Sequence, residues 1–216
     1  MPSSKPTLVP GAITASTWRT LAWMAVGAAL LLQPALAQEA SVRVRGVIER
    51  VDGAIYVIKT REGGEEKLKL AAGGVVSAVV PAKLSDITVG KYVGIAGTPL
   101  ADGSQKALEV LIFPDALRGL GEGFRPWDLQ PQSTMTNANV EATVAATDGQ
   151  VLTLKYKDGE KTIIVPAGIP IVAYVPGDVS EPKAGARIFV SAANKQPDGT
   201  LQAARVNVGR GAAPPM

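Results

Sequence analysis

The sequence contains neither cysteine nor histidine. Without cysteine the chain cannot form disulfides or use a thiol nucleophile. Without imidazole it lacks the usual ligands of zinc, copper and haem iron, and it lacks the base of a Ser-His-Asp triad. We therefore expect no metal, no cofactor and no enzymatic activity.

Aromatic residues are also scarce, at 5% of the chain, whereas 46% of the residues are hydrophobic and 19% are charged. These proportions are typical of a globular protein whose core is built from Val, Ile, Leu and Ala. The 23 glycines and 16 prolines favour many short strands and turns over long helices. The composition thus predicts an all-β fold.

The chain has little excess of charge of either sign, with 22 Lys and Arg against 19 Asp and Glu. Two of the basic residues, Lys5 and Arg19, lie in an N-terminal segment that we expect to be removed, and this segment has no acidic residue. Binding of nucleic acid requires a concentrated basic face. We therefore expect no nucleic-acid partner.

The only long apolar run is Leu21–Leu32, and with 12 residues it is short for a membrane span, which takes about 20. Pro34 follows, and then Ala35–Ala37, a small-x-small cleavage pattern. We predict that residues 1–37 are a signal peptide and that the mature chain begins at Gln38, soluble in the periplasm and without a membrane span. An uncleaved anchor is the alternative.

Two Asp-Gly pairs recur 96 residues further along the chain: Asp52-Gly53 as Asp148-Gly149, and Asp102-Gly103 as Asp198-Gly199. Segment 44–112 therefore aligns with segment 140–208. Because both turn signals fall at matching places, the alignment predicts a duplicated structural unit. Chance similarity between two β segments is the alternative.

Each copy shows the pattern of about five strands. Val42–Val51 alternates apolar and polar residues, as a half-buried strand does, and Asp-Gly between apolar runs is a strong hairpin signal. In the first copy a short helix or turn is expected at Lys83–Gly90. The other expected strands are Ala54–Thr60, Glu66–Leu70, Lys91–Ala96 and Gln105–Phe113, then Val140–Ala146, Val151–Lys157, Lys161–Val165, Ile188–Ala193 and Leu201–Val208.

This order of strands favours two tandem OB-like five-stranded barrels. The predicted domains are residues 38–113 and 140–209, joined by an ordered linker at 114–139 and followed by a tail at 210–216. A single larger β-sandwich made from both halves is the alternative.

The chain resembles a family of exported proteobacterial proteins with one or two OB-like domains. The resemblance rests on the segments VRVRGVIERVDG, ADGSQKALEVLIFP, GEGFRPWDLQPQSTMTNANV and RVNVGRGAAPPM. It implies a periplasmic location and assigns no activity. Some members carry a metal-transport permease label, which the lack of spanning apolar runs in this sequence does not support.

The linker holds Trp127, the only tryptophan after residue 37, and four charged residues gather near it: Arg118, Glu122, Arg125 and Asp128. In one interpretation Trp127 and Leu129 plug a barrel end or hold the two copies together, and Arg125 and Asp128 form an ion pair. In the other, Arg118, Arg125 and Trp127 bind a partner or an anionic ligand, since Trp and Arg are enriched at binding hot spots. The five residues around and including Trp127 are the candidate site.

The sequence favours a non-enzymatic periplasmic binding or interaction module. Its expected partner is an envelope protein. The alternative is a small ligand or an envelope polysaccharide, because OB folds accommodate oligosaccharides.

Overall fold

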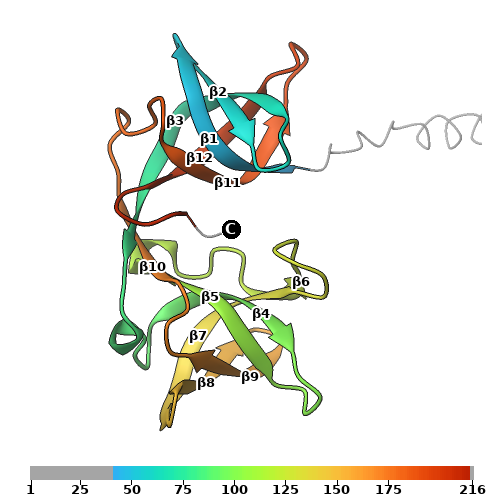
Figure 1. The fold of residues 1–216 in the computed structure, drawn as a ribbon, viewed down its shortest axis with the longest axis vertical. Helices are drawn as coiled ribbons and strands as arrows, with labels where there is room; N and C mark the ends of the chain where they lie inside the picture. Colours follow the sequence, from blue (N-terminus) through green and yellow to red (C-terminus); the bar gives the residue numbers. More distant parts are fainter. Residues whose placement is uncertain (1–40, 215–216) are drawn as a thin grey trace, which may run out of the picture. The chain divides into compact units, whose positions relative to one another are not determined.

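The computed structural model describes residues 41–214 and is all-β (Figure 1). Two short 3₁₀ helices, η1 (Leu84–Asp86) and η2 (Asp115–Leu117), interrupt the strands. The strands are β1 (Val42–Asp52), β2 (Ile55–Thr60), β3 (Glu65–Pro81), β4 (Tyr92–Pro99), β5 (Gln105–Phe113), β6 (Gly123–Pro126), β7 (Thr134–Ala146), β8 (Gly149–Tyr156), β9 (Gly159–Pro166), β10 (Ile171–Pro176), β11 (Arg187–Lys195) and β12 (Leu201–Gly209).

Five strands close into a barrel in the order β1-β2-β3-β12-β11. All neighbours are antiparallel except β3 and β12, whose parallel pairing from Leu68–Leu201 to Val79–Gly209 closes the ring. The inward positions are aliphatic, as the alternation in β1 predicts. Val44, Ile48, Ile58, Leu68 and Val206 are among the fully buried residues of this core.

The strands β4, β5, β9, β8 and β7 form a second ring of pairings. A short parallel contact completes it, in which Gln105 pairs with Ile163 and Lys106 with Ile164. Its interior holds a separate aliphatic core that includes Ile95, Leu152 and Leu154.

The strands are grouped differently from the contiguous copies that the sequence predicted. Strands β1, β2 and β3 of the first copy close their ring with β11 and β12 of the second copy, while β4 and β5 join β7, β8 and β9. The reason lies in β3, where the sequence predicted only the strand Glu66–Leu70. The observed strand has 17 residues and continues to Pro81 through an irregularity at Gly73-Gly74, where its register with β12 shifts between Leu70 and Val75. At its end β3 leaves the first ring, and the hairpin that follows it, β4–β5, belongs to the second ring.

The returning segment is β10, which pairs with the end of β3 in the antiparallel direction. The 96-residue offset aligns Ala78 with Tyr174 and Val79 with Val175, and the observed pairs are Ala78 with Val175 and Val79 with Tyr174. Each residue thus pairs with the equivalent of its neighbour, and the two pairs exchange when the copies are exchanged. A two-fold axis between the copies requires this register. A third cluster of buried side chains, which includes Val79, Phe113 and Tyr174, surrounds this crossing.

The predicted signal peptide, its cleavage after Ala37 and residues 215–216 of the tail lie outside the described residues. Within residues 41–214, no helix has the length and apolar character that a bilayer span requires.

Candidate functional site

The linker is an ordered structure tied to β7. Its β6 strand pairs with the start of β7, from Gly123–Asn137 to Pro126–Thr134. Trp127 follows β6 directly, and its backbone N–H donates to the carbonyl of Ser133 at 2.8 Å. The Ser133 hydroxyl donates back to the Trp127 carbonyl at 3.0 Å. These bonds fix the backbone at Trp127.

Two of the predicted site residues hold the linker to its neighbours. The Arg118 guanidinium donates to Asp115, to the carbonyl of Gly90 and to the side chain of Asn139. The Glu122 carboxylate accepts the backbone N–H of Lys157 at 3.0 Å. Both side chains therefore have intramolecular roles in this structure.

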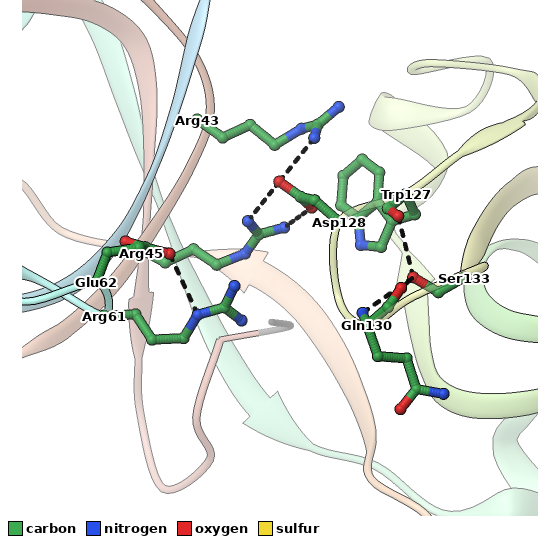
Figure 2. Close-up of polar contacts among 8 residues, drawn as sticks. All are labelled: Arg43, Arg45, Arg61, Glu62, Trp127, Asp128, Gln130 and Ser133. Carbon is green, nitrogen blue, oxygen red and sulfur yellow. Dashed lines mark hydrogen bonds and ion pairs between the residues drawn. The ribbon is translucent and has the colours of Figure 1, made fainter.

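Asp128 binds two arginines of β1, as Figure 2 shows. The Arg45 guanidinium donates to both carboxylate oxygens, at 2.8 and 3.0 Å, and Arg43 lies 2.9 Å from one of them. The expected Arg125–Asp128 ion pair is therefore wrong, because Arg125 lies in β6 and donates to the carbonyl of Gly121 at 2.7 Å. Asp128 instead links the linker to the first barrel.

Three guanidinium groups surround the half-buried indole ring of Trp127. Arg43 lies 4.1 Å from the ring centroid, Arg45 5.4 Å and Arg125 5.6 Å. Such contacts are attractive because the face of an aromatic ring is electron-rich. Burial and the nearby Arg43 charge lower the pKa of Arg125, and Asp128 supplies negative charge beside this group (Figure 2).

A cavity of about 140 Å³ lies beside Trp127. Of the predicted site residues, Trp127 and Arg125 line it, whereas Arg118, Glu122 and Asp128 do not. Most of the rest of its lining comes from strands of both rings, and Leu120, Gly121 and Tyr174 of the linker and β10 complete it. The residues that sequence reasoning missed include Glu109, Phe113, Asn137, Phe189, Arg205 and Asn207. Asn207 gave no local signal, because it alternates with Val206 and Val208, which face the first core, and the sequence pattern therefore places it on the outer face of its strand.

Three buried polar atoms on the cavity's side chains have no hydrogen-bond partner among the described residues: Trp127 Nε1, Asn137 Oδ1 and Asn207 Oδ1. Asn137 and Asn207 are 6% and 1% exposed. A buried polar group without a partner costs about 1–3 kcal/mol. Such groups are uncommon in folded proteins and call for an explanation.

Two tyrosines near the cavity keep their phenol protons at neutral pH. Burial and, secondarily, Glu122 raise the pKa of Tyr92 to about 12. Burial also raises the pKa of Tyr174 well above its usual value. Both phenols therefore stay protonated and can act as hydrogen-bond donors. Among residues 41–214 no group of three or more carboxylates is placed to hold a metal ion.

The link between Asp128 and β1 predicts a pH-dependent stability. Burial would raise the pKa of Asp128, but the hydrogen bonds and charges of Arg45 and Arg43 outweigh it and lower the pKa from 3.8 to about 2. Stabilisation by the ionised form is then complete above about pH 4 and is lost as the pH falls through about 2. Because the side chain is 47% exposed, we expect screening to reduce this contribution to about 1 kcal/mol.

We therefore expect Asp128→Asn to lower the free energy of unfolding by about 1 kcal/mol at neutral pH, with the difference from wild type vanishing towards pH 2. Urea titrations across this range measure it. Asp115→Asn, which removes an exposed ion pair with Arg118, is the control and should cost less than about 0.5 kcal/mol. A difference that stays constant with pH would contradict the assigned ion pairs.

Comparison of the chain with protein-family models, with curated proteins and with solved structures found no match.

Proposed function

We propose that the chain is exported to the periplasm as a non-enzymatic binding protein built from two OB-like barrels that exchange hairpins. The N-terminal apolar run and the Ala35–Ala37 pattern support export. In both rings a three-stranded meander is closed by a hairpin with one parallel contact, at β3–β12 and at β5–β9. This arrangement supports an OB-like topology for both rings.

The ligand that we propose is a small molecule bound in the cavity beside Trp127. The observation that carries this proposal is that buried polar atoms of Trp127, Asn137 and Asn207 have no hydrogen-bond partner in the described part of the chain. Ligand sites combine an apolar lining with a few placed polar groups, and here Phe113, Met135 and Phe189 supply part of the apolar lining.

The geometry favours a small ligand over the two other partners that the sequence allowed. Arg118, Glu122 and Asp128 are engaged within the chain, which argues against the linker as a surface for an envelope protein. A cavity of about 140 Å³ compares with the roughly 150 Å³ that holds benzene. It is therefore too small for a polysaccharide segment.

A thermal-shift screen of small organic fragments against the chain from Gln38 tests this proposal, because a ligand specific to the native state raises the melting temperature. Ser191→Phe, at an exposed position of β11 that lines the cavity, should block binding. Ala192→Phe, at the next exposed position and outside the lining, is the matched control. We expect fragments that stabilise the wild type and Ala192→Phe but not Ser191→Phe; the proposal fails if no fragment shows this pattern.

A further inference from the structure

We infer that the cavity selects an uncharged, ring-bearing amide of about the size of benzamide. This inference rests on the proposed function and specifies its ligand class. The evidence is the number, kind and orientation of the unpartnered atoms, together with the size and charge of the cavity.

Two of the atoms are acceptors with fixed orientation. The Asn137 amide nitrogen donates to the carbonyl of Leu120 at 2.9 Å, and the Asn207 amide nitrogen donates to the carbonyl of Phe189 at 2.9 Å. Because a carbonyl can only accept, neither side-chain amide can be turned over. Each Oδ1 atom is therefore an acceptor that can take a hydrogen bond from a donor of a bound molecule.

The third atom, Trp127 Nε1, is a donor, since the indole nitrogen carries a hydrogen and accepts nothing. A complementary ligand thus needs two N–H or O–H donors and one acceptor. A primary carboxamide supplies this set, with two N–H donors and a carbonyl oxygen on one planar group.

The charges of the groups that line the cavity narrow the class of ligand further. A carboxylate of the same shape offers no donor and would leave both asparagine oxygens unpaired. An ammonium group could satisfy these oxygens, but the cavity is lined by two guanidinium groups, Arg125 and Arg205, against the single carboxylate of Glu109. Arg205 is held in place by a hydrogen bond to the Ser77 hydroxyl at 2.7 Å. The uncharged amide avoids both penalties.

Size and lining favour an aromatic ring on the amide. The cavity volume of about 140 Å³ is close to that of an engineered cavity that holds one benzene molecule. Leu111, Phe113 and Phe189 line it, and aromatic side chains pack well against a planar ring.

The test compares four probes of one ring size: benzamide, benzoate, benzylamine and toluene. Calorimetric titration of the chain from Gln38 should show benzamide binding at least about tenfold more tightly than each of the others, since a site built for hydrogen bonds rejects analogues that lack them. If toluene or benzoate binds as well as benzamide, the amide inference is overturned while the proposed function stands. If none of the four binds, the amide inference is also overturned, and the fragment screen decides the proposed function separately.

Two variants assign the preference to the named atoms. Asn207→Ala removes one acceptor, and Trp127→Phe removes the donor while it keeps an aromatic ring. Each should reduce benzamide affinity about tenfold and leave toluene affinity within about threefold. Toluene binding also shows that the cavity has survived the substitution. An amide preference that persists in both variants would refute the assignment. If a variant fails to fold, Ser191→Phe takes its place as the test, and benzamide binding that survives Ser191→Phe would show that the site is wrong.

Discussion

Cutting the chain between Pro131 and Gln132 is expected to leave two pieces that remain associated as a native complex, while neither piece folds by itself. The cut falls at an exposed position between β6 and β7. The N-terminal piece then holds β1 to β6 and the C-terminal piece holds β7 to β12. Each ring loses two or three of its five strands when the pieces separate.

The physical reason is that separation opens both rings and exposes both cores. The first barrel would lose its whole β3–β12 and β1–β11 pairing, and their backbone groups would become unpaired edges. Inward residues such as Val206 and Val44 would lose contacts across the break. Isolated three-stranded and two-stranded pieces of this kind bury too little apolar surface to be stable.

A protease recognition sequence inserted at this position makes the experiment direct. After cleavage, size-exclusion chromatography should show one species, and circular dichroism should match the uncut chain. Pieces purified in denaturant should each be unfolded and should regain the spectrum only on mixing. Two pieces that unfold cooperatively and independently would instead support contiguous domains. The same insertion placed after Gly209, beyond the last strand, controls for effects of the added residues.

The sequence predicted most of the strands because their signals are local. Gln105–Phe113 has the expected bounds, and the expected Asp-Gly turns at Asp102-Gly103 and Asp198-Gly199 join β4 to β5 and β11 to β12. The all-β class is confirmed. Missed elements are short or lie where the pattern is weak, such as β6 and the part of β7 before Val140.

The pairing partners of the strands could not be predicted from local sequence signals. Alternation tells which face of a strand is inward, but it does not tell which edge the strand joins. Two similar copies offer similar edges, so a hairpin can close its own ring or the ring of the other copy, as in domain swapping. The continuation of β3 past Gly73-Gly74 to Pro81 decides between them, and this glycine pair gave no sign in the sequence that the strand continues.

The candidate site was predicted only in part for the same reason. Trp127 and Arg125 were recognisable because they are unusual residues in a linker. Asn137 and Asn207 lie in β7 and β12 and belong to different rings. Their shared position at one cavity follows from the exchange of strands, which no local pattern contains.

Replacement of Trp127 by alanine is expected to lower the free energy of unfolding by about 2–3 kcal/mol. A fully buried tryptophan would cost about 3–5 kcal/mol, but this ring is half-buried. The loss combines its packing with its contacts to the guanidinium groups of Arg43 and Arg45. Urea unfolding of the chain from Gln38 measures the difference.

Trp127→Phe separates the ring from its N–H group. Because the indole N–H is buried and has no hydrogen-bond partner among residues 41–214, its removal relieves a desolvation cost while the ring contacts persist. We therefore expect Trp127→Phe to lie within about 1 kcal/mol of wild type. Trp127 is the only tryptophan after residue 37, so native emission should be blue-shifted and should move to the red on unfolding. Native emission that is already red, with Trp127→Ala within about 0.5 kcal/mol of wild type, would show that the ring is a free surface contact and that the linker is a partner-binding surface.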